Sequence, residues 1–499
     1  MNALVAFPIL LPFVLIIVLL IFRTVRIAGY IALAGTFLLL MLSFVLFWMV
    51  RQQGVVVLQM GGWEAPFGIT LVVDYLSALM LVVAAVILLS LAVYAPRFLP
   101  GEISITRFFQ LFFALAMGLN GAFITGDVFN LFVWFEVMLM SSFVLITMGR
   151  TKDQLEGGIK YLALNLVGSM FFLAGAGLLY AKTGTLNMAH LAIILRDDCQ
   201  AITMNTTAIL FFMAFGIKAA LFPLYFWLPA SYHTPNIVIS SLFAGLLTKV
   251  GVYAFIRFFT LFFVQDPRFW HPLLLIIAGL TMVAGGMAAA AHYETRRILS
   301  YHIISQIGYM IMGLGIFTPL AIAGSVFFTL HNMIAKTNTF LVSGMINKAR
   351  GTFELKEVGG LFRQSPLMAV LFIIPAFALA GVPPLSGFFA KFILIKAGIE
   401  NGNFVITSVA VITSMLTLYS MIKIWNEAFM KVQPANEYAS RSFRKPSFGE
   451  YFPSLFLGGI SLLMGVFAVY LFDYTLEAAN QLLNPDLYIE TVWKGGTGK

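Results

Sequence analysis

Cysteine and charged residues are what this sequence has least of. Cys199 is the lone cysteine among 499 residues, so an intrachain disulfide and a cysteine-based metal cluster are both excluded. Charged residues make up 10% of the chain, whereas a soluble protein of this size would need about twice that fraction. The composition therefore excludes a soluble fold.

Several other patterns are missing. Apolar and polar residues do not alternate with period two, which excludes a membrane β-barrel. The net charge of +9 is spread over short loops, and no basic face with interleaved aromatic residues exists, so no nucleic-acid partner is expected. No His, Cys or carboxylate cluster has metal-ligand spacing, and no glycine-rich loop follows a strand. Neither a metal nor a cofactor is expected.

Long apolar blocks are what the chain does contain. Hydrophobic residues make up 61% of it, and they come in blocks of about 20 residues, the length that crosses a bilayer as a helix. The sequence predicts an all-α polytopic membrane protein, a single membrane domain over residues 1–499 with about fourteen spans. The predicted spans start near residues 3, 28, 71, 108, 128, 159, 205, 236, 272, 297, 322, 366, 404 and 454.

Loop charge sets the expected orientation. One set of loops holds seventeen basic residues, and the opposite set, with the C-terminal tail, holds seven. Because basic residues favour the cytoplasmic side, the first set is expected to be cytoplasmic and both termini outside. The first set is Arg23, Arg26, Arg97, Arg107, Arg150, Lys152, Lys160, Arg296, Arg297, Lys348, Arg350, Lys356, Arg363, Lys431, Arg441, Arg444 and Lys445. The opposite set is Arg51, Lys182, Arg196, Arg257, Arg268, Lys494 and Lys499.

The seventh and twelfth predicted spans contain prolines near their centres. Proline removes a backbone donor and clashes with the preceding turn, so both spans are predicted to be broken inside the membrane. The alternative is that the prolines are tolerated kinks. The prolines are Pro223 and Pro229 in the seventh span and Pro383 and Pro384 in the twelfth.

The two broken spans are expected to cross the membrane in opposite directions, which is typical of inverted repeats with a site at the midplane. We expect spans 4–8 and spans 9–13 to form two such five-helix repeats. The chain then divides into spans 1–3 (1–100), a first repeat (108–262), a second repeat (272–430) and a last span (454–475).

Ionisable residues lie inside the apolar blocks. Hydrocarbon disfavours a charged side chain by roughly 2.5 to 3.5 kcal/mol, so such residues indicate a functional site. A buried carboxylate and a buried lysine can exchange ionised and neutral forms, as a proton relay requires; a structural ion pair between Glu136 and Lys218 is the alternative. The six residues, called the relay residues below, are Glu136, Lys218, Lys249, His331, Lys336 and Lys391.

Three further patterns qualify this hypothesis. His331 and Lys336 are five residues apart, on different helix faces, so a bulge or a water has to connect them. His302, Ser305 and Tyr309 of the tenth span form either a water-lined face or a set of helix–helix contacts. Lys423 and Glu427 are one turn apart and are predicted to form a local ion pair.

Five stretches carry a resemblance to a known family. They are GDVFNLFVWFEVMLMSSFVLI, WLPASYHTPN, LLTKVGVYAFIRFF, SQIGYM and GVPPLSGFFAKF. With the fourteen spans and the buried lysines, they closely resemble the antiporter-like subunits of respiratory complex I and of Mrp-type cation/proton antiporters. The first three stretches look most like the D subunits of multisubunit Mrp sodium/proton antiporters. Tyr232 and His233 stand where the family commonly has smaller residues.

The resemblance implies a proton-translocating subunit in a prokaryotic cell (inner) membrane. Its complex would exchange cytoplasmic Na⁺ for external H⁺ under the proton-motive force and serve pH homeostasis. The chain would then be a secondary transporter subunit, not an enzyme, with other hydrophobic subunits, H⁺, Na⁺ and the lipid bilayer as partners. Protons would pass through the relay residues from Glu136 to Lys391.

Two alternatives remain. The chain also resembles a proton-pumping membrane subunit of a redox-driven complex, either a complex I-like NADH:quinone oxidoreductase or a membrane-bound hydrogenase. It is also compatible with an assembly scaffold whose charges only hold helices together. Because Na⁺ prefers several oxygen ligands and one carboxylate amid lysines offers few, we expect the sodium path to lie largely in partner subunits.

Overall fold

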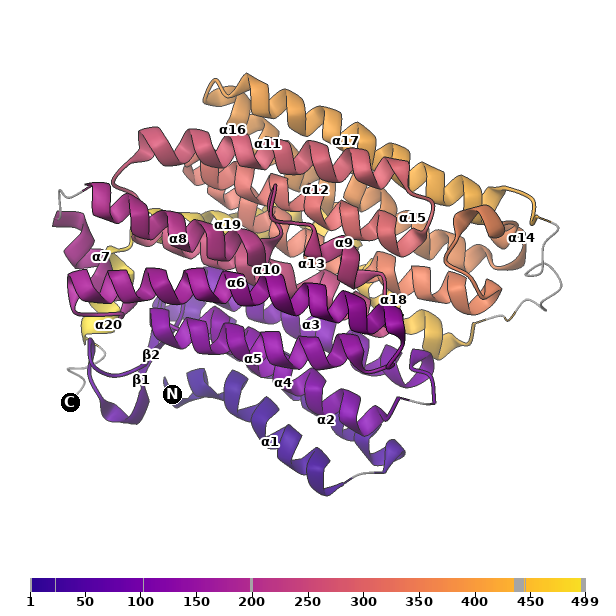
Figure 1. Ribbon diagram of the computed structural model, residues 1–499, viewed down its shortest axis with the longest axis horizontal. Helices are drawn as coiled ribbons and strands as arrows, with labels where there is room; N and C mark the ends of the chain where they lie inside the picture. Colours follow the sequence, from indigo (N-terminus) through magenta and orange to yellow (C-terminus); the bar gives the residue numbers. More distant parts are fainter. Residues whose placement is uncertain are drawn as a thin grey trace.

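The computed structural model of the chain is a bundle of long helices that run roughly antiparallel, with a small sheet at one end (Figure 1). It describes residues 2–22, 24–101, 103–197, 201–434, 444 and 446–494. Cys199 and four of the loop cations counted for the topology lie outside the described residues. These cations are Arg23, Arg441, Lys445 and Lys499.

The elements follow one another in four groups. The first comprises η1 (Asn2–Ala6), α1 (Phe7–Ile21), α2 (Val25–Gln53), β1 (Val56–Gln59), η2 (Met60–Gly62), β2 (Thr70–Val73) and α3 (Tyr75–Phe98). The second comprises α4 (Ile105–Ile124), α5 (Val128–Thr147), α6 (Lys152–Thr183), α7 (Met188–Asp197), α8 (Ala201–Ala219), α9 (Trp227–Tyr232) and α10 (Ile237–Leu261). The third comprises α11 (Pro267–Ala291), α12 (Thr295–Ile316), α13 (Pro319–Arg350), η3 (Leu355–Glu357), α14 (Leu361–Gln364), α15 (Pro366–Ala380), α16 (Ser386–Glu400) and α17 (Phe404–Trp425). The last comprises the π-helix η4 (Asn426–Met430), α18 (Phe448–Val466), α19 (Ala468–Leu483) and α20 (Asp486–Lys494).

The prediction of an all-α polytopic membrane protein is confirmed. Eleven helices of the described residues are long and apolar enough to cross a membrane. The other three predicted spans correspond to α8 and α15, which are short because they are broken, and to α13, which is long but carries a run of polar residues. The count of fourteen spans therefore stays a prediction.

Short polar side chains fix where the helices of the bundle begin. Asp127 accepts a hydrogen bond from the backbone N–H of Asn130 at the start of α5, and Glu294 does the same for Arg297 in α12. Such caps satisfy donors that a helix N-terminus leaves unpaired. The segment 124–129 (ITGDVF) thus separates α4 from α5, at the span start predicted near residue 128.

Both predicted helix breaks are present. The seventh span divides into α8 and α9, with Pro223 in the turn between them and Pro229 in the first turn of α9. The twelfth divides into α15 and α16, with Pro383 and Pro384 in the connection. Gly381 ends α15 in a left-handed conformation with φ of 89°, which glycine adopts at little cost.

The two broken helices run in opposite directions. In Figure 1, α8 begins at the end of the bundle that holds α7, whereas α15 begins at the other end, next to α14. The third helix of each proposed repeat, α6 and α13, has 32 residues. These features agree with inverted repeats, although the segment boundaries stay a prediction.

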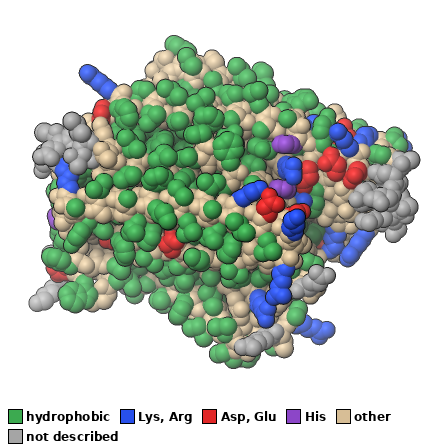
Figure 2. Space-filling view, in the orientation of Figure 1, with side chains coloured by type: hydrophobic (Ala, Val, Ile, Leu, Met, Phe, Trp, Pro, Cys, Tyr) green, Lys and Arg blue, Asp and Glu red, His purple; other side chains and the backbone are tan. Residues whose placement is uncertain are grey.

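Basic loop residues gather at one end of the bundle. Figure 2 shows most of the visible Lys and Arg side chains at the right-hand end. Arg97, Arg296 and Lys348 line one surface depression there, and Lys160 and Arg297 line another. This end is called the basic end below. The described chain starts and finishes at the opposite end, where η1 and α20 both contact β1.

The last predicted span, 454–475, is wrong as one continuous helix. The structure interrupts it at Phe467, between α18 and α19. The interruption follows Gly465, whose backbone lies against the connection between α15 and α16; a Cβ atom there would be 2.2 Å from the carbonyl oxygen of Pro384. Close packing on the broken helix therefore coincides with the bend.

Candidate functional site

Glu136, Ser169 and Lys218 meet at the centre of the first repeat. The hydroxyl of Ser169, on α6, donates a hydrogen bond to Glu136 Oε1 of α5. Lys218, in the last turn of α8, donates from Nζ to Ser169 Oγ over 3.4 Å. The expected contact between Glu136 and Lys218 is therefore indirect, through a serine that the sequence analysis did not identify.

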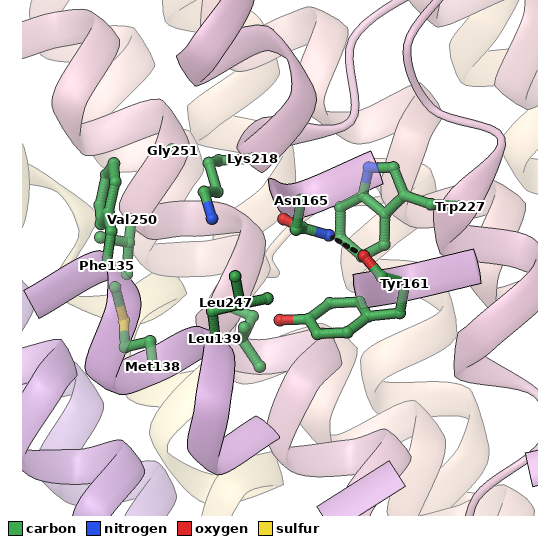
Figure 3. Close-up of a pocket in the computed structure, with 10 residues that line it drawn as sticks. All are labelled: Phe135, Met138, Leu139, Tyr161, Asn165, Lys218, Trp227, Leu247, Val250 and Gly251. Carbon is green, nitrogen blue, oxygen red and sulfur yellow. Dashed lines mark hydrogen bonds between the residues drawn. The ribbon is translucent and has the colours of Figure 1, made fainter. Parts of the chain in front are cut away.

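A small cavity adjoins Lys218. Its volume is about 20 Å³, which is room for about one water molecule. The Lys218 amine and the Tyr161 hydroxyl point toward it, with Asn165 beside them (Figure 3). The cavity is bounded on the far side by Leu247, Val250 and Gly251 of α10. Polar groups and space for water thus occur together at the break in the seventh span.

Lys249 lies on α10, in the same stretch as the lining residues Leu247 and Val250. Its side chain is fully buried, and Nζ donates to the carbonyl oxygen of Ala244 over 2.6 Å. The side chain therefore bends back along its own helix. No carboxylate of the described residues lies within ion-pair distance of Lys249.

Lys336 occupies the middle of α13. Its ammonium group is fully buried and has no hydrogen-bond partner among the described residues. The side-chain amide of Asn332, one turn earlier, is also unpartnered. Lys336 interacts electrostatically with both Lys249 and Lys391. Buried polar groups are satisfied by ordered water where protein partners are missing, so we infer water along this part of α13.

His331 faces the other broken helix. Its Nδ1 forms a 2.8 Å hydrogen bond with Ser386 Oγ at the start of α16, and Ser386 is 3.2 Å from Ser461 Oγ of α18. Nε2 has no partner in the described part of the chain. His331 and Lys336 make no direct contact, so the expected need for a connecting group remains.

Lys391 binds the backbone at the break between α15 and α16. Its Nζ donates to the carbonyl oxygens of Leu379 (2.8 Å) and Ala380 (3.1 Å) and to Ser414 Oγ of α17 (2.8 Å). These carbonyls are left without helical partners because α15 ends at Ala380. The C-terminus of a helix also carries partial negative charge. A cation is therefore stabilised there without a carboxylate.

The tenth-span residues differ among themselves. Tyr309 donates its hydroxyl to the carbonyl of Ala410, and its ring lies 5.1 Å from Lys391 Nζ. His302 and Ser305 are fully buried, and their side-chain polar atoms have no partner among the residues that the structure describes. Tyr309 therefore makes a helix–helix contact, whereas His302 and Ser305 retain the features expected of a water-lined face.

Two expectations about charged residues are wrong: the pairing of Lys423 with Glu427 and the position of Arg257 in a loop. Glu427 pairs with Lys431 at 2.5 Å, whereas Lys423 Nζ donates to the carbonyls of Ala290 and His292 at the end of α11. Arg257, counted as a loop residue, is buried in α10 and forms a bidentate ion pair with Asp74 at 2.6 and 2.9 Å. Tertiary packing, which local spacing does not encode, selects the partners of Lys423 and Arg257, whereas Glu427 takes the lysine one turn later instead of the one a turn earlier.

The described residues contain no group of three or more His, Cys, Asp or Glu side chains that could hold a metal ion. Four of the six relay residues are lysines. Lysine ammonium groups and hydroxyls can pass protons but offer few ligands to a hard cation. The relay residues therefore include groups that can accept and release protons.

Comparison with known proteins decides the family. Residues 125–417 match the family model described as "NADH:quinone oxidoreductase/Mrp antiporter, TM". The chain belongs to this family. It is 44% identical over 498 residues to the D subunit of the Na(+)/H(+) antiporter of Alkalihalophilus pseudofirmus, covering 99% of this chain and 100% of the relative.

Two solved structures have the same architecture. A chain of the Mrp complex from Dietzia sp. DQ12-45-1b superposes with a TM-score of 0.91 at 29% identity, over 99% of both chains. A chain of the archaeal membrane-bound sulfane sulfur reductase, a respiratory membrane complex, superposes with a TM-score of 0.89 at 27% identity, over 98% of this chain and 99% of that chain. The same helical bundle therefore occurs in an Mrp complex and in a respiratory membrane complex.

Proposed function

We propose that this chain is the proton-translocating D-type subunit of a multisubunit Mrp antiporter, which exchanges cytoplasmic Na⁺ for external H⁺ under the proton-motive force. The observation that carries the proposal is the link from Glu136 through Ser169 to Lys218 at a broken helix. The full-length similarity to antiporter D subunits supports the choice of reaction. The basic end would face the cytoplasm, with both termini outside.

The proton enters the relay at Glu136. Its carboxylate accepts a hydrogen bond from Ser169, which in turn accepts one from Lys218. A change in the protonation of Glu136 therefore alters the charge that Lys218 experiences. Coupled groups of this kind titrate together, so apparent pKa values belong to the set of groups.

The charge then passes along the lysines. Lys336 interacts electrostatically with Lys249 and Lys391, so a proton on one of them disfavours a proton on its neighbour. Unpartnered polar atoms around Asn332 and His331 are positions for the water that would carry protons between the lysines. Lys391 is the terminal site because the carbonyls of α15 stabilise its charged form.

Sodium is assigned to other subunits. Carboxylates are scarce in the interior of the described bundle, and the one among the relay residues, Glu136, accepts a hydrogen bond from Ser169. We therefore infer that hydrophobic partner subunits provide most of the cation path, and that this chain supplies the proton movement that drives it.

A redox-driven complex is the second candidate. The observation that favours it is the superposition on the respiratory sulfane sulfur reductase. Purification in mild detergent discriminates between the two: several small hydrophobic subunits support the antiporter, and flavin or iron–sulfur subunits support the redox complex.

Lys218→Ala tests the transport function itself. Everted vesicles that contain the whole complex are expected to lose sodium-dependent proton exchange, by about two orders of magnitude, because one positioned proton-transfer group contributes that much. The matched control is Lys160→Ala, which removes an exposed lysine paired with Glu156. Unchanged exchange in an assembled Lys218→Ala complex would contradict the proposal.

A further inference from the structure

A largely apolar groove runs along the surface of the bundle between α2 and α18. Leu89 and Val93 of α3 form its floor, and side chains of α2 and α18 form its walls. The wall residues Tyr30 and Phe452 are 74% and 42% exposed, whereas the floor residues are partly buried. The groove has a volume of about 660 Å³, which lies in the range of roughly 300 to 1,000 Å³ that is usual for small-molecule sites. An apolar molecule can therefore lie between the two walls.

Each wall presents one row of side chains. Tyr30, Leu33 and Phe37 follow one another on α2 at intervals of three and four residues, so they lie on one helix face. On α18, the rings of Phe452 and Phe456 are stacked with their centroids 6.2 Å apart. Both rows follow their helix axes, so the groove runs in the same direction as the spans. This is also the direction in which lipid acyl chains lie in a bilayer.

An arginine lies at the basic end of each of the three helices that form the groove. Arg26 precedes Tyr30 by one turn of α2, and Arg97 follows Val93 by one turn of α3. Arg444 precedes the start of α18 by four residues. All three side chains are exposed. The apolar groove therefore ends at a set of exposed cations.

Arg97 joins the groove to the polar depression at the basic end. Its Nη1 donates to the carbonyl oxygen of Val93 over 2.7 Å, and Val93 lines the groove whereas Arg97 lines the depression. A Cβ atom on Gly449 would lie 2.6 Å from Arg97 Nε, so the guanidinium group lies against the first turn of α18. The depression has a volume of about 420 Å³. Arg97 is thus held where the two hollows meet.

Cations outnumber carboxylates around the depression. Four cations line it, and two carboxylates pair with them within the described residues, which leaves an excess of two positive charges. Arg97 has no carboxylate of the described chain within ion-pair distance. An anion beside Arg97 is therefore stabilised. The cations are Arg97, Arg296, Lys348 and Arg444, and the carboxylates are Glu294 and Glu450.

Aromatic rings hold two of these cations in place. The Arg296 guanidinium lies 4.0 Å from the centre of the Phe353 ring, and Lys348 Nζ lies 4.4 Å from that of Phe98. Lys348 also donates to the backbone carbonyl of Arg97 over 2.6 Å. Such contacts restrict the side chains before a ligand arrives, which lowers the entropic cost of binding.

We propose that the groove and the depression together bind one anionic phospholipid of the bilayer. Its acyl chains lie in the groove, and its phosphate lies between Arg97 and Arg444. Basic pockets between spans bind anionic head groups, and guanidinium groups form paired hydrogen bonds with phosphate oxygens.

Charge favours a lipid over a helix of a partner subunit. An apolar helix would fill the groove, but it would leave the excess positive charge at the end of the groove without a counter-charge. The site is separate from the relay residues, so the inference goes beyond the transport function and does not depend on it.

The test compares labels at two neighbouring positions of α2. Phe37 lines the groove and Leu38 does not, although the two side chains are 50% and 53% exposed and differ in depth by only about 1.5 Å. Phe37→Cys and Leu38→Cys, each in a Cys199→Ser chain, carry a bimane fluorophore. The whole complex is placed in phosphatidylcholine vesicles with a small fraction of nitroxide-labelled phosphatidylglycerol or nitroxide-labelled phosphatidylcholine as quencher.

The two quenchers are expected to differ at position 37 alone. There, phosphatidylglycerol should quench at an about fivefold lower mole fraction than phosphatidylcholine, as expected for contacts with basic residues. At position 38 the two lipids should quench equally. Arg97→Gln combined with Arg444→Gln should abolish the difference at position 37. The matched control, Arg107→Gln, removes an exposed arginine of α4 that lines neither hollow and should preserve it.

Two results of this measurement overturn the proposal. Equal quenching by the two lipids at position 37 would mean that the groove does not select an anionic head group. Quenching by neither lipid at position 37, with position 38 quenched, would mean that a partner subunit fills the groove.

The melting temperature of the unlabelled complex is the second measurement, for use if the labelled chains do not assemble. A ligand that binds the folded state raises this temperature. Replacing added phosphatidylcholine with phosphatidylglycerol should raise it more in the wild type and in Arg107→Gln than in Arg444→Gln, whose side chain is exposed. An equal rise in all three overturns the proposal.

Discussion

The ammonium group of Lys391 lies 2.8 Å from the carbonyl oxygen of Leu379, the last residue but one of α15. Lysine and carbonyl belong to the two halves of one broken helix. The break leaves the carbonyl without a helical donor, and the lysine supplies one. The bond explains how a lysine remains in an apolar bundle without a carboxylate partner.

Replacing Lys391 with arginine separates a relay from a scaffold. Arginine keeps the positive charge and the donors, but it does not release its proton in proteins. Lys391→Arg is expected to assemble and to lose proton exchange by about two orders of magnitude. The control is Lys396→Arg, an exposed lysine of α16 paired with Glu400. Proton exchange at the wild-type rate in Lys391→Arg would show that a fixed positive charge at this position is sufficient for transport and that Lys391 does not have to release a proton.

Ser169→Ala tests the bridge between Glu136 and Lys218. The substitution removes the hydroxyl that binds both groups, and a hydrogen bond to a charged group contributes about 1.5 kcal/mol or more, roughly tenfold in rate. Sodium-dependent proton exchange in everted vesicles should fall by about that factor. Ser90→Ala is the control, because that buried hydroxyl binds the backbone of its own helix at Val86. Equal exchange rates in the two variants would show that Ser169 does not connect Glu136 to Lys218 functionally.

Gly465→Ala tests the contact between α18 and the second break. A methyl group there would lie 2.2 Å from the Pro384 carbonyl oxygen, so α18 or the break has to shift. We expect slower sodium-dependent proton exchange and a lower melting temperature of the purified complex. Overpacking of this kind typically costs about 1 to 3 kcal/mol of folding free energy. Gly459→Ala, on the same helix with open space around its Cβ position, should behave as wild type. A Gly465→Ala complex as stable and active as Gly459→Ala would contradict this packing.

The buried pair Asp74–Arg257 predicts a pH dependence. Burial alone would raise the pKa of Asp74, but the charge and hydrogen bonds of Arg257 outweigh it and lower the pKa below its usual value. Because the folded pKa lies below the unfolded one, the stabilisation is present above about pH 4 and is lost as the pH falls through the folded pKa.

Thermal unfolding of the purified complex checks this. Asp74→Asn leaves Arg257 buried without its partner, which should cost about 3 to 5 kcal/mol. The difference in melting temperature from wild type should be the same at pH 7 and pH 5 and should shrink only near pH 4 and below. Glu156→Gln, which removes an exposed ion pair, should show almost no difference. A difference for Asp74→Asn that shrinks between pH 7 and pH 5 would mean that the pKa is not lowered.

Patterns that depend on local chemistry could be predicted from the sequence. Proline and glycine act on their own helix, so Pro223 and Pro384 indicated both breaks correctly. The length of each apolar block is also a local property, and it predicted the starts of most membrane-crossing helices to within a few residues. The relay lysines were visible because charge in an apolar block is unusual whatever surrounds it.

Partners across helices could not be predicted. Ser169 is a buried serine and Ser414 a half-buried one, and neither is unusual in an apolar helix. Only the packing of α6 on α8 and of α16 on α17 brings them to lysines. Arg257 lies near a helix end, where a loop cation is equally plausible from sequence spacing. Such contacts join residues more than twenty positions apart, and no local signal carries them.

In the proposed mechanism, protons cross this subunit through Glu136. The most direct measurement reconstitutes the purified whole complex in liposomes with a pH indicator inside and applies a sodium gradient. The wild type and Glu156→Gln should change the internal pH when sodium is added, and Glu136→Gln, with the same subunits present, should not. An assembled Glu136→Gln complex that moves protons at the wild-type rate would show that Glu136 is not on the proton path.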